Sequence, residues 1–304
     1  MEAGTTVGRV HSFGRGVLGR SVDGALGAAR FVVHDPALLA ASAMLGVLVF
    51  LALFGQVVWP KSTTAVNLND SLLPPSVSHP MGTDSLGRDV FARFNEGARI
   101  SLSIGATVVV TGALFGSAVG VLAGTLGKGT DNVLMRTMDS LLAFPPLILA
   151  MAVTVGLGVG LVTATFGVIL TTIPYYARLT RSEVLQIRSR NFVEAARALG
   201  ARRGRIMIRH IVPHLTSTLL IQSAAVFGYA ILAIAALGFV GLGAQVPTPE
   251  WGSMITDGLN NVLTGGWWIG VFPGLGVLLA VTATSIIADR SRDIFDPRGQ
   301  YVRL

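Results

Sequence analysis

Two long uncharged stretches constrain the fold of this chain more than any other feature. Residues 140–177 and 210–249 contain no Asp, Glu, Lys or Arg. A helix needs about 20 apolar residues to cross the hydrocarbon core of a bilayer, so each stretch is long enough for a span. Only 13% of all residues are charged, about half of the roughly 25% that is usual in soluble domains. These features predict an all-α integral membrane protein.

Six membrane-spanning helices are expected from the uncharged segments. The stretch at 140–177 is too long for one span, and its central glycines predict a tight turn between two helices. The stretch at 210–249 is interpreted as one long helix with a Gly-rich exit. The spans are expected at 37–58, at 100–127, from Val133 to the turn at Gly156–Gly160, from that turn to Ala177, after Pro213, and at 258–288.

The basic residues indicate the orientation of these spans. With the N-terminus in the cytoplasm, nineteen of the 23 Lys and Arg residues lie in cytoplasmic segments, many of them in the loop at 178–212. An excess of Lys and Arg marks the cytoplasmic side of membrane proteins. We therefore expect both termini and this loop in the cytoplasm. The same distribution explains the net charge of +7 through topology, with no nucleic acid partner.

The spans and loops divide the chain into five segments. Residues 1–36 form a basic cytoplasmic N-terminal segment, and 37–59 form a first transmembrane anchor whose apolar run is too long for a cleaved signal peptide. Residues 60–99, which contain four prolines, are expected to form an ordered extracytoplasmic loop. Residues 100–288 form a five-helix core that includes the cytoplasmic loop, and 289–304 form a cytoplasmic tail.

No pattern in the chain indicates an enzyme site. The absence of cysteine excludes disulfides, thiolate metal sites and cysteine nucleophiles. His210 and His214 have the spacing of a zinc-binding helix, but Pro213 interrupts that helix and the Glu of zinc proteases is missing. Residues 127–130 are not a P-loop, because Gly follows Lys where Ser or Thr would bind magnesium. We expect no catalytic, cofactor-binding or metal-binding residues on this chain.

The second span carries glycines at every fourth position, namely Gly112, Gly116, Gly120 and Gly124. Residues four apart share one face of a helix. In membranes a face of small residues lets a neighbouring backbone approach closely. We interpret this face as a helix-packing surface, which implies a tight bundle or a partner helix but names no function.

The basic loop at 178–212 contains the signals of a short helix. Asn191 is interpreted as its N-cap, and Glu194 falls at the third helical position, as in a capping box. Ala195 and Ala196 follow, and alanine is the strongest helix former. The result is a short helix with small side chains, held between two longer helices.

Gly200 and Pro213 delimit the segment that follows this helix. Gly200 is the expected terminator, in the left-handed conformation, and Pro213 suits the first turn of the next span. Small side chains leave space for the helix to enter a groove on another protein. From the spacing alone, an amphipathic loop at the membrane interface explains the pattern equally well.

This loop resembles the EAA loop of ABC importer permeases. Glu194-Ala195-Ala196, then Gly200 after three intervening residues, and Pro213 thirteen positions later fit the family pattern. His210 stands where the family usually has Ile, a mild departure that is common in the peptide-permease branch. Further segments resemble that branch, in the same order: His79–Asp89, Gly97–Leu102, Asp139–Pro145, Pro247–Met254 and Arg292–Arg298. Together they are similar to the C-type permease of dipeptide, oligopeptide and nickel importers.

The resemblance implies a non-enzymatic permease subunit of an ATP-driven importer, with a type I importer-like bundle in the cytoplasmic membrane of a prokaryote. It implies a paralogous second permease and an extracytoplasmic substrate-binding protein. It also implies one or two cytoplasmic ABC ATPase subunits, which bind the ATP and Mg. The helix at 191–200 would transmit the motion of the ATPase to the bundle. The implied cargo is dipeptides or oligopeptides, with nickel chelates as the alternative.

Two other functional classes compete with this interpretation. A secondary transporter usually carries ionisable groups in the middle of its spans, and the predicted spans have none there. A purely structural membrane partner is disfavoured by the chemistry of the loop.

Two further features of the predicted spans have local consequences. Pro145 and Pro146 are expected to break or kink the third span, either as a packing kink or as a gating hinge. Trp251, Trp267 and Trp268 are expected to anchor the protein at the outer membrane interface.

Overall fold

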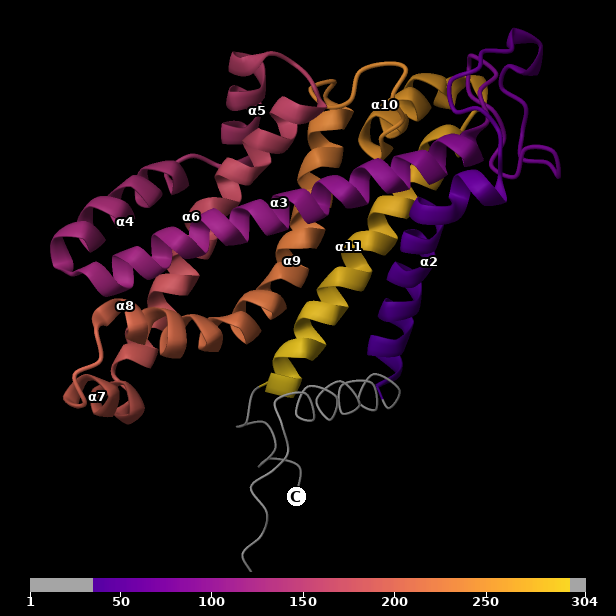
Figure 1. Ribbon diagram of the computed structural model, residues 1–304. Coiled ribbons are helices and arrows are strands. Elements are labelled where there is room, and N and C mark those ends of the chain that lie inside the picture. Colours follow the sequence, from indigo (N-terminus) through magenta and orange to yellow (C-terminus); the bar gives the residue numbers. More distant parts are fainter. Residues whose placement is uncertain (1–34, 296–304) are drawn as a thin grey trace, which may run out of the picture. The chain divides into compact units, whose positions relative to one another are not determined.

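The computed structural model describes residues 35–295 (Figure 1). Within that range the regular structure is helical, apart from one isolated bridge between Thr83 and Asp89. The all-α prediction is therefore confirmed for this part of the chain.

The helices follow one another with short connections, except for an irregular segment between the first two. The longer ones are α2 (Pro36–Val58), α3 (Val90–Leu126), α4 (Lys128–Leu142), α5 (Pro146–Leu157), α6 (Leu161–Arg188), α7 (Asn191–Ala198), α9 (Val212–Phe239), α10 (Trp251–Asn261) and α11 (Trp268–Phe295). The shorter ones are η1 (Leu68–Asp70), α8 (Arg203–Ile206), the π-helical turn η2 (Met207–Ile211) and η3 (Val262–Thr264).

Helix α2 crosses the boundary between two compact units of the chain, one up to Ala40 and the other from Ala41 onward. Asp35 caps α2, because its carboxylate accepts a hydrogen bond from the N–H of Ala37 at 2.9 Å. Pro36 suits the first helical position, where its missing N–H leaves no donor unsatisfied. The helix thus begins one residue before the predicted start.

Four helices in the described residues are long and apolar enough to cross a membrane: Pro36–Val58, Val90–Leu126, Gly204–Phe239 and Trp268–Arg292. The pair α4 and α5 makes a fifth if it counts as one bent span. Helix α6 is not among them, because threonines, tyrosines and Pro174 dilute the hydropathy of its first part and Arg residues occupy the second. The structure thus has four or five candidate spans where six were predicted.

Helix α3 begins at Val90, ten residues before the predicted span. The carboxylate of Asp89 accepts a hydrogen bond from the N–H of Ala92 at 2.9 Å and so caps the helix. A search for uncharged runs misses these first turns because they contain charged residues such as Arg93. The predicted outer loop at 60–99 is therefore shorter and ends where α3 starts.

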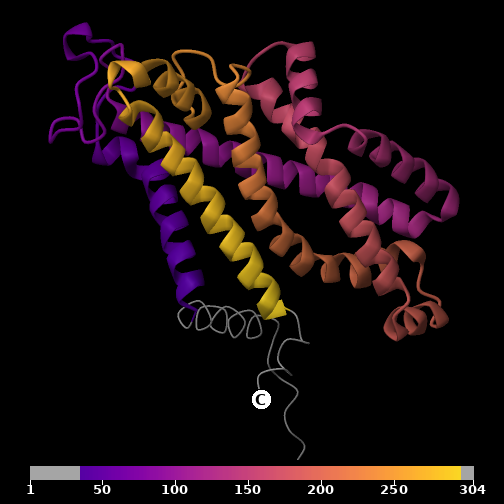
Figure 2. The same ribbon diagram turned by 180° about the vertical axis from the view of Figure 1, so that it is seen from behind.

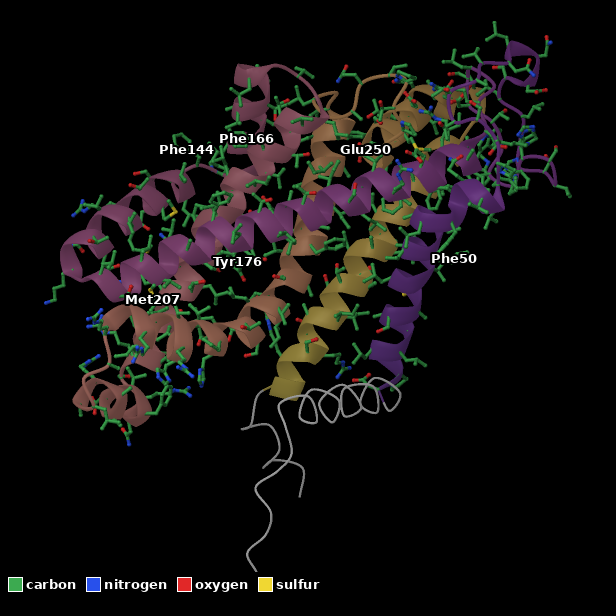
Figure 3. All side chains as sticks on the ribbon, in the orientation of Figure 1. Phe50, Phe144, Phe166, Tyr176, Met207 and Glu250 are labelled. Atoms are coloured by element: carbon green, nitrogen blue, oxygen red, sulfur yellow. The ribbon has the colours of Figure 1, made fainter. Side chains whose placement is uncertain are left out.

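The third predicted span is two helices, since α4 and α5 meet at an angle of 88°. Pro145 and Pro146 cause the break: neither has an N–H to continue the helix, and Pro145 has an extended ψ of 128°. Phe144 lies at this break, with 56% of its surface exposed (Figure 3). The predicted turn after α5 is confirmed, with Gly158 at a φ of 103° and α6 starting at Leu161.

The last predicted span, at 258–288, is also divided. Helix α10 contains Gly258, and α11 starts only at Trp268. Gly265 between them has a left-handed φ of 88°, which ends η3 and turns the chain. The turn lets α10 pack against α11 so closely that a Cβ on Gly258 would overlap the backbone of Gly270. A span was predicted there because the turn and both helices lack charge over most of their length.

Buried apolar residues form three clusters in the bundle. One surrounds Trp251 and joins α2, α3, α9, α10 and α11, with the rings of Phe94 and Trp251 stacked at a centroid distance of 5.5 Å. The second joins α3, α5, α6 and α9. The third lies around α7 and the start of α9. Both views show α5 and α10 at one end of these helices and α7 and α8 at the other (Figures 1 and 2).

Candidate functional site

The predicted short helix is α7, which lies just beyond the last turn of α6 (Figure 1). Val193 is its one fully buried side chain and anchors it to the third apolar cluster. The other buried members of this cluster come from α3, α6 and the segment that leads into α9: Val121, Val184, Ile187, Ile206, Ile211 and Leu215. Motion of α7 would therefore pass directly to three long helices.

The start of α7 differs from the predicted capping box. Arg190, with extended φ and ψ of −80° and 146°, occupies the N-cap position, and Asn191 is the first helical residue. The carbonyl of Arg190 accepts the N–H groups of Val193 at 3.0 Å and Glu194 at 3.3 Å, and no side chain caps the helix. Glu194 stays in the first turn, where its negative charge interacts favourably with the helix dipole.

The end of α7 is a Schellman motif. The N–H of Gly200 donates to the carbonyl of Arg197 at 3.0 Å, and the N–H of Ala201 donates to that of Ala196 at 3.1 Å. Gly200 has a φ of 80°, the left-handed conformation that was predicted. A Cβ there would meet nothing within 4 Å, so the need for glycine is conformational rather than steric.

Pro213 lies in the first turn of α9, as was predicted. The helical segment that leads into α9 already begins at Gly204. The π-helical turn at Met207–Ile211 carries the chain into α9, and the N–H of Val212 reaches the carbonyl of Met207.

The two histidines around Pro213 have local partners. Nδ1 of His214 lies 2.7 Å from the carbonyl oxygen of His210, and its ring stacks on Phe192 at 5.2 Å. Among the side chains that the structure describes, no three His, Asp or Glu residues gather as ligands of a metal ion would.

The two alanines of the predicted coupling set face different ways. Ala195 is exposed, whereas Ala196 is half-buried and packs against the third cluster. Leu199, at the C-cap, has 89% of its surface exposed. The exposed side of α7 and its C-cap thus combines small residues with two large apolar side chains, Phe192 and Leu199, a surface suited to a partner's groove.

Ion pairs connect α4 and α6 near this loop. Arg181 and Asp131 form two hydrogen bonds, one of them 2.7 Å from Nη2 to Oδ2. Arg178 and Asp139 approach to 2.6 Å. Arg188 Nη1 donates to the carbonyl of Gly124 in α3 at 2.9 Å. These polar contacts fix the end of α6 that leads into α7 between α3 and α4.

All four glycines of the predicted stripe are buried against α6: Gly112, Gly116, Gly120 and Gly124. A Cβ at Gly116 would lie 2.6 Å from the carbonyl oxygen of Ile173, and one at Gly120 would lie 2.5 Å from that of Ala177. Both distances are well inside van der Waals contact, so the two helix backbones touch at these positions. Helix α6 packs against α3 more than against any other helix.

At the opposite end of the bundle, several charged side chains are buried together. A search for uncharged runs does not detect them. Asp84 is 2.6 Å from Arg88 and 3.6 Å from Arg93, and all three are at most 5% exposed. Asp89 lies 2.8 Å from the ring of His79 and accepts from Lys61 at 3.2 Å. The one signal in the sequence was the resemblance of residues 79–89 to the permease branch. This network rigidifies the loop that leads into α3.

Glu250, at the start of α10, is fully buried (Figure 3). Its carboxylate accepts from the N–H groups of Gly252 at 2.8 Å and Ser253 at 3.1 Å, and from the hydroxyl of Ser101 at 3.3 Å. Burial raises the pKa of this carboxyl, while the backbone N–H groups act in the opposite direction. Glu250 thereby connects α10 to α3.

The interfacial position that was predicted for three tryptophans is wrong for two of them. Trp251 is fully buried and its indole N–H donates to the carbonyl of Phe94 at 3.2 Å. Trp268 is 7% exposed and donates to the carbonyl of Thr83 at 3.0 Å. Their N–H groups are satisfied inside the protein, so they bury their rings in its core. Trp267 is 50% exposed and stays a predicted anchor.

Comparison with known proteins identifies one family, two relatives and one solved structure that are similar to this chain. Residues 116–300 match the family model described as binding-protein-dependent transport system inner membrane component. The chain is 38% identical over 250 residues to the dipeptide transport system permease protein DppC of Alkalihalophilus pseudofirmus, covering 82% of each. It is 37% identical over 265 residues to the probable D,D-dipeptide transport system permease protein DdpC of Escherichia coli, covering 87% of this chain and 89% of that one. The solved MetNI methionine ABC transporter, in inward-facing conformations, has a chain that shares the fold, with a TM-score of 0.52 and 22% identity over 66% of this chain and 95% of that one.

Proposed function

Because this chain belongs to the family of binding-protein-dependent transport system inner membrane components, we propose that it imports dipeptides or oligopeptides as one permease subunit of an ABC importer. The single observation that carries the cargo is the identity of 37–38% over most of the chain to permeases named for dipeptide transport. Nickel chelates are the alternative cargo. The chain itself is a transport subunit and not an enzyme.

We propose six spans in the cytoplasmic membrane, with both termini and the 178–212 loop in the cytoplasm, as the basic residues indicate. Helix α6 would be the span that hydropathy alone does not detect. Its 28 residues extend over about 42 Å, longer than the roughly 30 Å hydrocarbon core. It needs little apolar surface, because its polar face is covered: Thr172 and Tyr176 pack on the glycine stripe of α3. Helices α4 and α5 would together make one crossing.

Helix α7 is proposed as the contact with the ATPase, through Glu194, Ala195, Ala196 and Gly200, with Pro213 placing the start of α9. What supports this is the exposed small surface of Ala195, the exposed Leu199 and the apolar cluster behind them. ATP and Mg would bind to that ATPase, present as one or two subunits. Closure of the ATPase would move α7 as a rigid body and, with it, α3, α6 and α9.

Two further partners complete the proposed importer. A paralogous second permease would form the other half of the translocation path. An extracytoplasmic substrate-binding protein would dock at the end of the bundle that carries α10 and the loop before α3. The buried ion pairs of Asp84 support this role, because a rigid loop presents a fixed surface to a partner.

The coupling proposal is tested by comparing Ala195→Asp with Ala196→Asp in the whole transporter. Ala195→Asp places a charge on the exposed surface, so the permease should accumulate normally but lose ATPase association and dipeptide uptake. Ala196→Asp places a charge against the protein's own core, at a cost of several kcal/mol if unpaired, so its protein level should fall as well. Normal uptake by Ala195→Asp would refute the coupling role of α7. The proposed peptide cargo would be refuted if the unaltered transporter took up nickel chelates but no dipeptide.

A further inference from the structure

A groove opens between α6 and α9, beside the break between α4 and α5. Its volume is about 330 Å³, within the range of roughly 300–1,000 Å³ that small-molecule sites occupy. Its walls are mainly apolar and include two tyrosines. The lining residues that matter here are Leu142, Pro146, Thr171, Tyr175, Val226 and Tyr229.

In the proposed topology, the groove lies at the depth of the hydrocarbon core. Tyr229 is about 15 Å from the Phe239 end of α9 at 1.5 Å per residue, half of the roughly 30 Å hydrocarbon core. Its side chain is 39% exposed, and its hydroxyl makes no hydrogen bond with the part of the chain that the structure describes. A hydroxyl without a partner is unfavourable in hydrocarbon. This position therefore favours water or a ligand with polar groups over a lipid tail.

Polar side chains border the groove on the side of the α7 loop. The hydroxyl of Tyr175 donates to Oε1 of Gln222 at 2.9 Å, and Nη2 of Arg292 donates to the same oxygen at 2.8 Å. Arg178, on the same helix as Tyr175, pairs with Asp139 of α4, and both side chains are about half exposed. Ionisable groups in membrane proteins face the bundle interior or a water-filled cavity. The edge of the groove is thus aqueous.

We propose that this groove is a subsite of the translocation path that holds an uncharged side chain of the peptide in transit, an inference that rests on the proposed function. Pro146 and Val226 supply an apolar wall for an aliphatic or aromatic side chain. The hydroxyl of Tyr229 hydrogen-bonds to a peptide carbonyl, which a lipid tail lacks. A packed helix of another subunit would instead cover the exposed ion pair beside the groove.

Accessibility is tested in membrane vesicles that contain the whole transporter. The chain has no native cysteine, so Tyr229→Cys is a single target. Val47→Cys is the matched control, because it is 57% exposed and lies about 17 Å from the Val58 end of α2. A small charged methanethiosulfonate should modify Tyr229→Cys about tenfold faster than the control, since charged reagents avoid hydrocarbon. Equal, slow modification of both would mean that lipid or another helix fills the groove, and would overturn the proposal.

Occupancy is tested by protection and by specificity. During turnover, alanyl-phenylalanine should slow the modification of Tyr229→Cys, and modification at an unchanged rate would refute the subsite. Ala225 also lines the groove. Ala225→Leu therefore narrows the groove and should raise the KM for alanyl-phenylalanine about tenfold, while the KM for glycylglycine changes less than about twofold. Val226→Ala widens the groove and should shift the preference between the two dipeptides toward alanyl-phenylalanine. Equal effects on both dipeptides would refute the subsite alone, whereas failure of the unaltered transporter to import either dipeptide would refute the proposed function.

Discussion

At the scale of single residues, backbone conformation and protonation decide what each position of the site tolerates. Gly200 and Gly204 illustrate this, because a Cβ at either would meet nothing within 4 Å. Of the two, Gly200 alone has a positive φ, of 80°. Because neither position is crowded, a difference between substitutions at Gly200 and Gly204 reports the conformational strain at Gly200.

We expect Gly200→Val to destabilise the end of α7 by about 1–2 kcal/mol, the cost of a left-handed residue with a Cβ. Gly204→Ala, in a helix, should be neutral or slightly stabilising, and Gly200→Asn should retain most function because Asn tolerates this conformation. Dipeptide uptake and ATPase association of the purified complex are the measurements. Uptake by Gly200→Val equal to that by Gly204→Ala would show that the cap is dispensable.

Glu250 makes stability depend on pH in the direction opposite to most carboxylates. Burial raises its pKa in the folded protein above the ordinary value of 4.5. The folded state then binds the proton more tightly, so this group's contribution to stability is greatest at acid pH and is lost as the pH rises through the raised pKa. Glu250→Gln removes this contribution. In thermal unfolding of the detergent-purified complex, the stability of the wild type relative to Glu250→Gln should therefore fall as the pH rises from 4.5; a pH-independent difference would contradict the assignment.

At the scale of elements, contact between backbones decides how the helices pair. The glycine stripe of α3 places its backbone directly against α6. Gly105 lies off the stripe and faces side chains of α9 instead, where an added Cβ would lie 3.1 Å from Cε2 of Phe227. Side chains can move where backbone carbonyls cannot, so substitutions at the two places should differ in severity.

We expect Gly116→Leu and Gly120→Leu to separate α3 from α6 and to lower the yield of assembled transporter strongly. Gly105→Leu should be intermediate. Gly46→Leu in α2 is the matched control, since a Cβ there meets nothing within 4 Å. The yields are compared by size-exclusion chromatography after mild solubilisation. If the stripe variants assemble as well as Gly46→Leu, the glycines are not needed for packing.

At the scale of the whole molecule, the side of the membrane on which each loop lies determines how the importer assembles. Ser76 lies in the exposed loop between α2 and α3, and Ser189 lies between α6 and α7. An odd number of crossings must separate the two if α7 meets a cytoplasmic ATPase while the other loop meets an extracytoplasmic protein.

In intact cells, a membrane-impermeant maleimide should label Ser76→Cys and should label Ser189→Cys only after the cells are opened. The native chain has no cysteine, so the background is zero. Labelling of Ser189→Cys in intact cells would exclude the six-span topology and the coupling role of α7 together.

The sequence by itself determined the features that depend on local chemistry. The uncharged runs showed which segments are helical and apolar. The four-residue spacing of the glycines from Gly112 to Gly124 placed them on one helix face. The residues from Glu194 to Gly200 were enough to predict the short helix and its left-handed end. Motifs in order along the chain were enough for the family. Each of these follows from neighbouring residues, whose effect does not depend on distant contacts.

Only the tertiary structure decided the features that depend on residues far apart in the chain. The first turns of α3 carry charges that are buried only because Asp84 from the preceding loop pairs with Arg88 and Arg93. Trp251 and Trp268 point inward because carbonyls of Phe94 and Thr83, distant in sequence, accept their N–H groups. The direction of Ala196 and the groove between α6 and α9 likewise arise from how helices pack. The burial of a side chain and the pairing of charged groups depend on how the helices pack, so the hydropathy along the chain does not predict them.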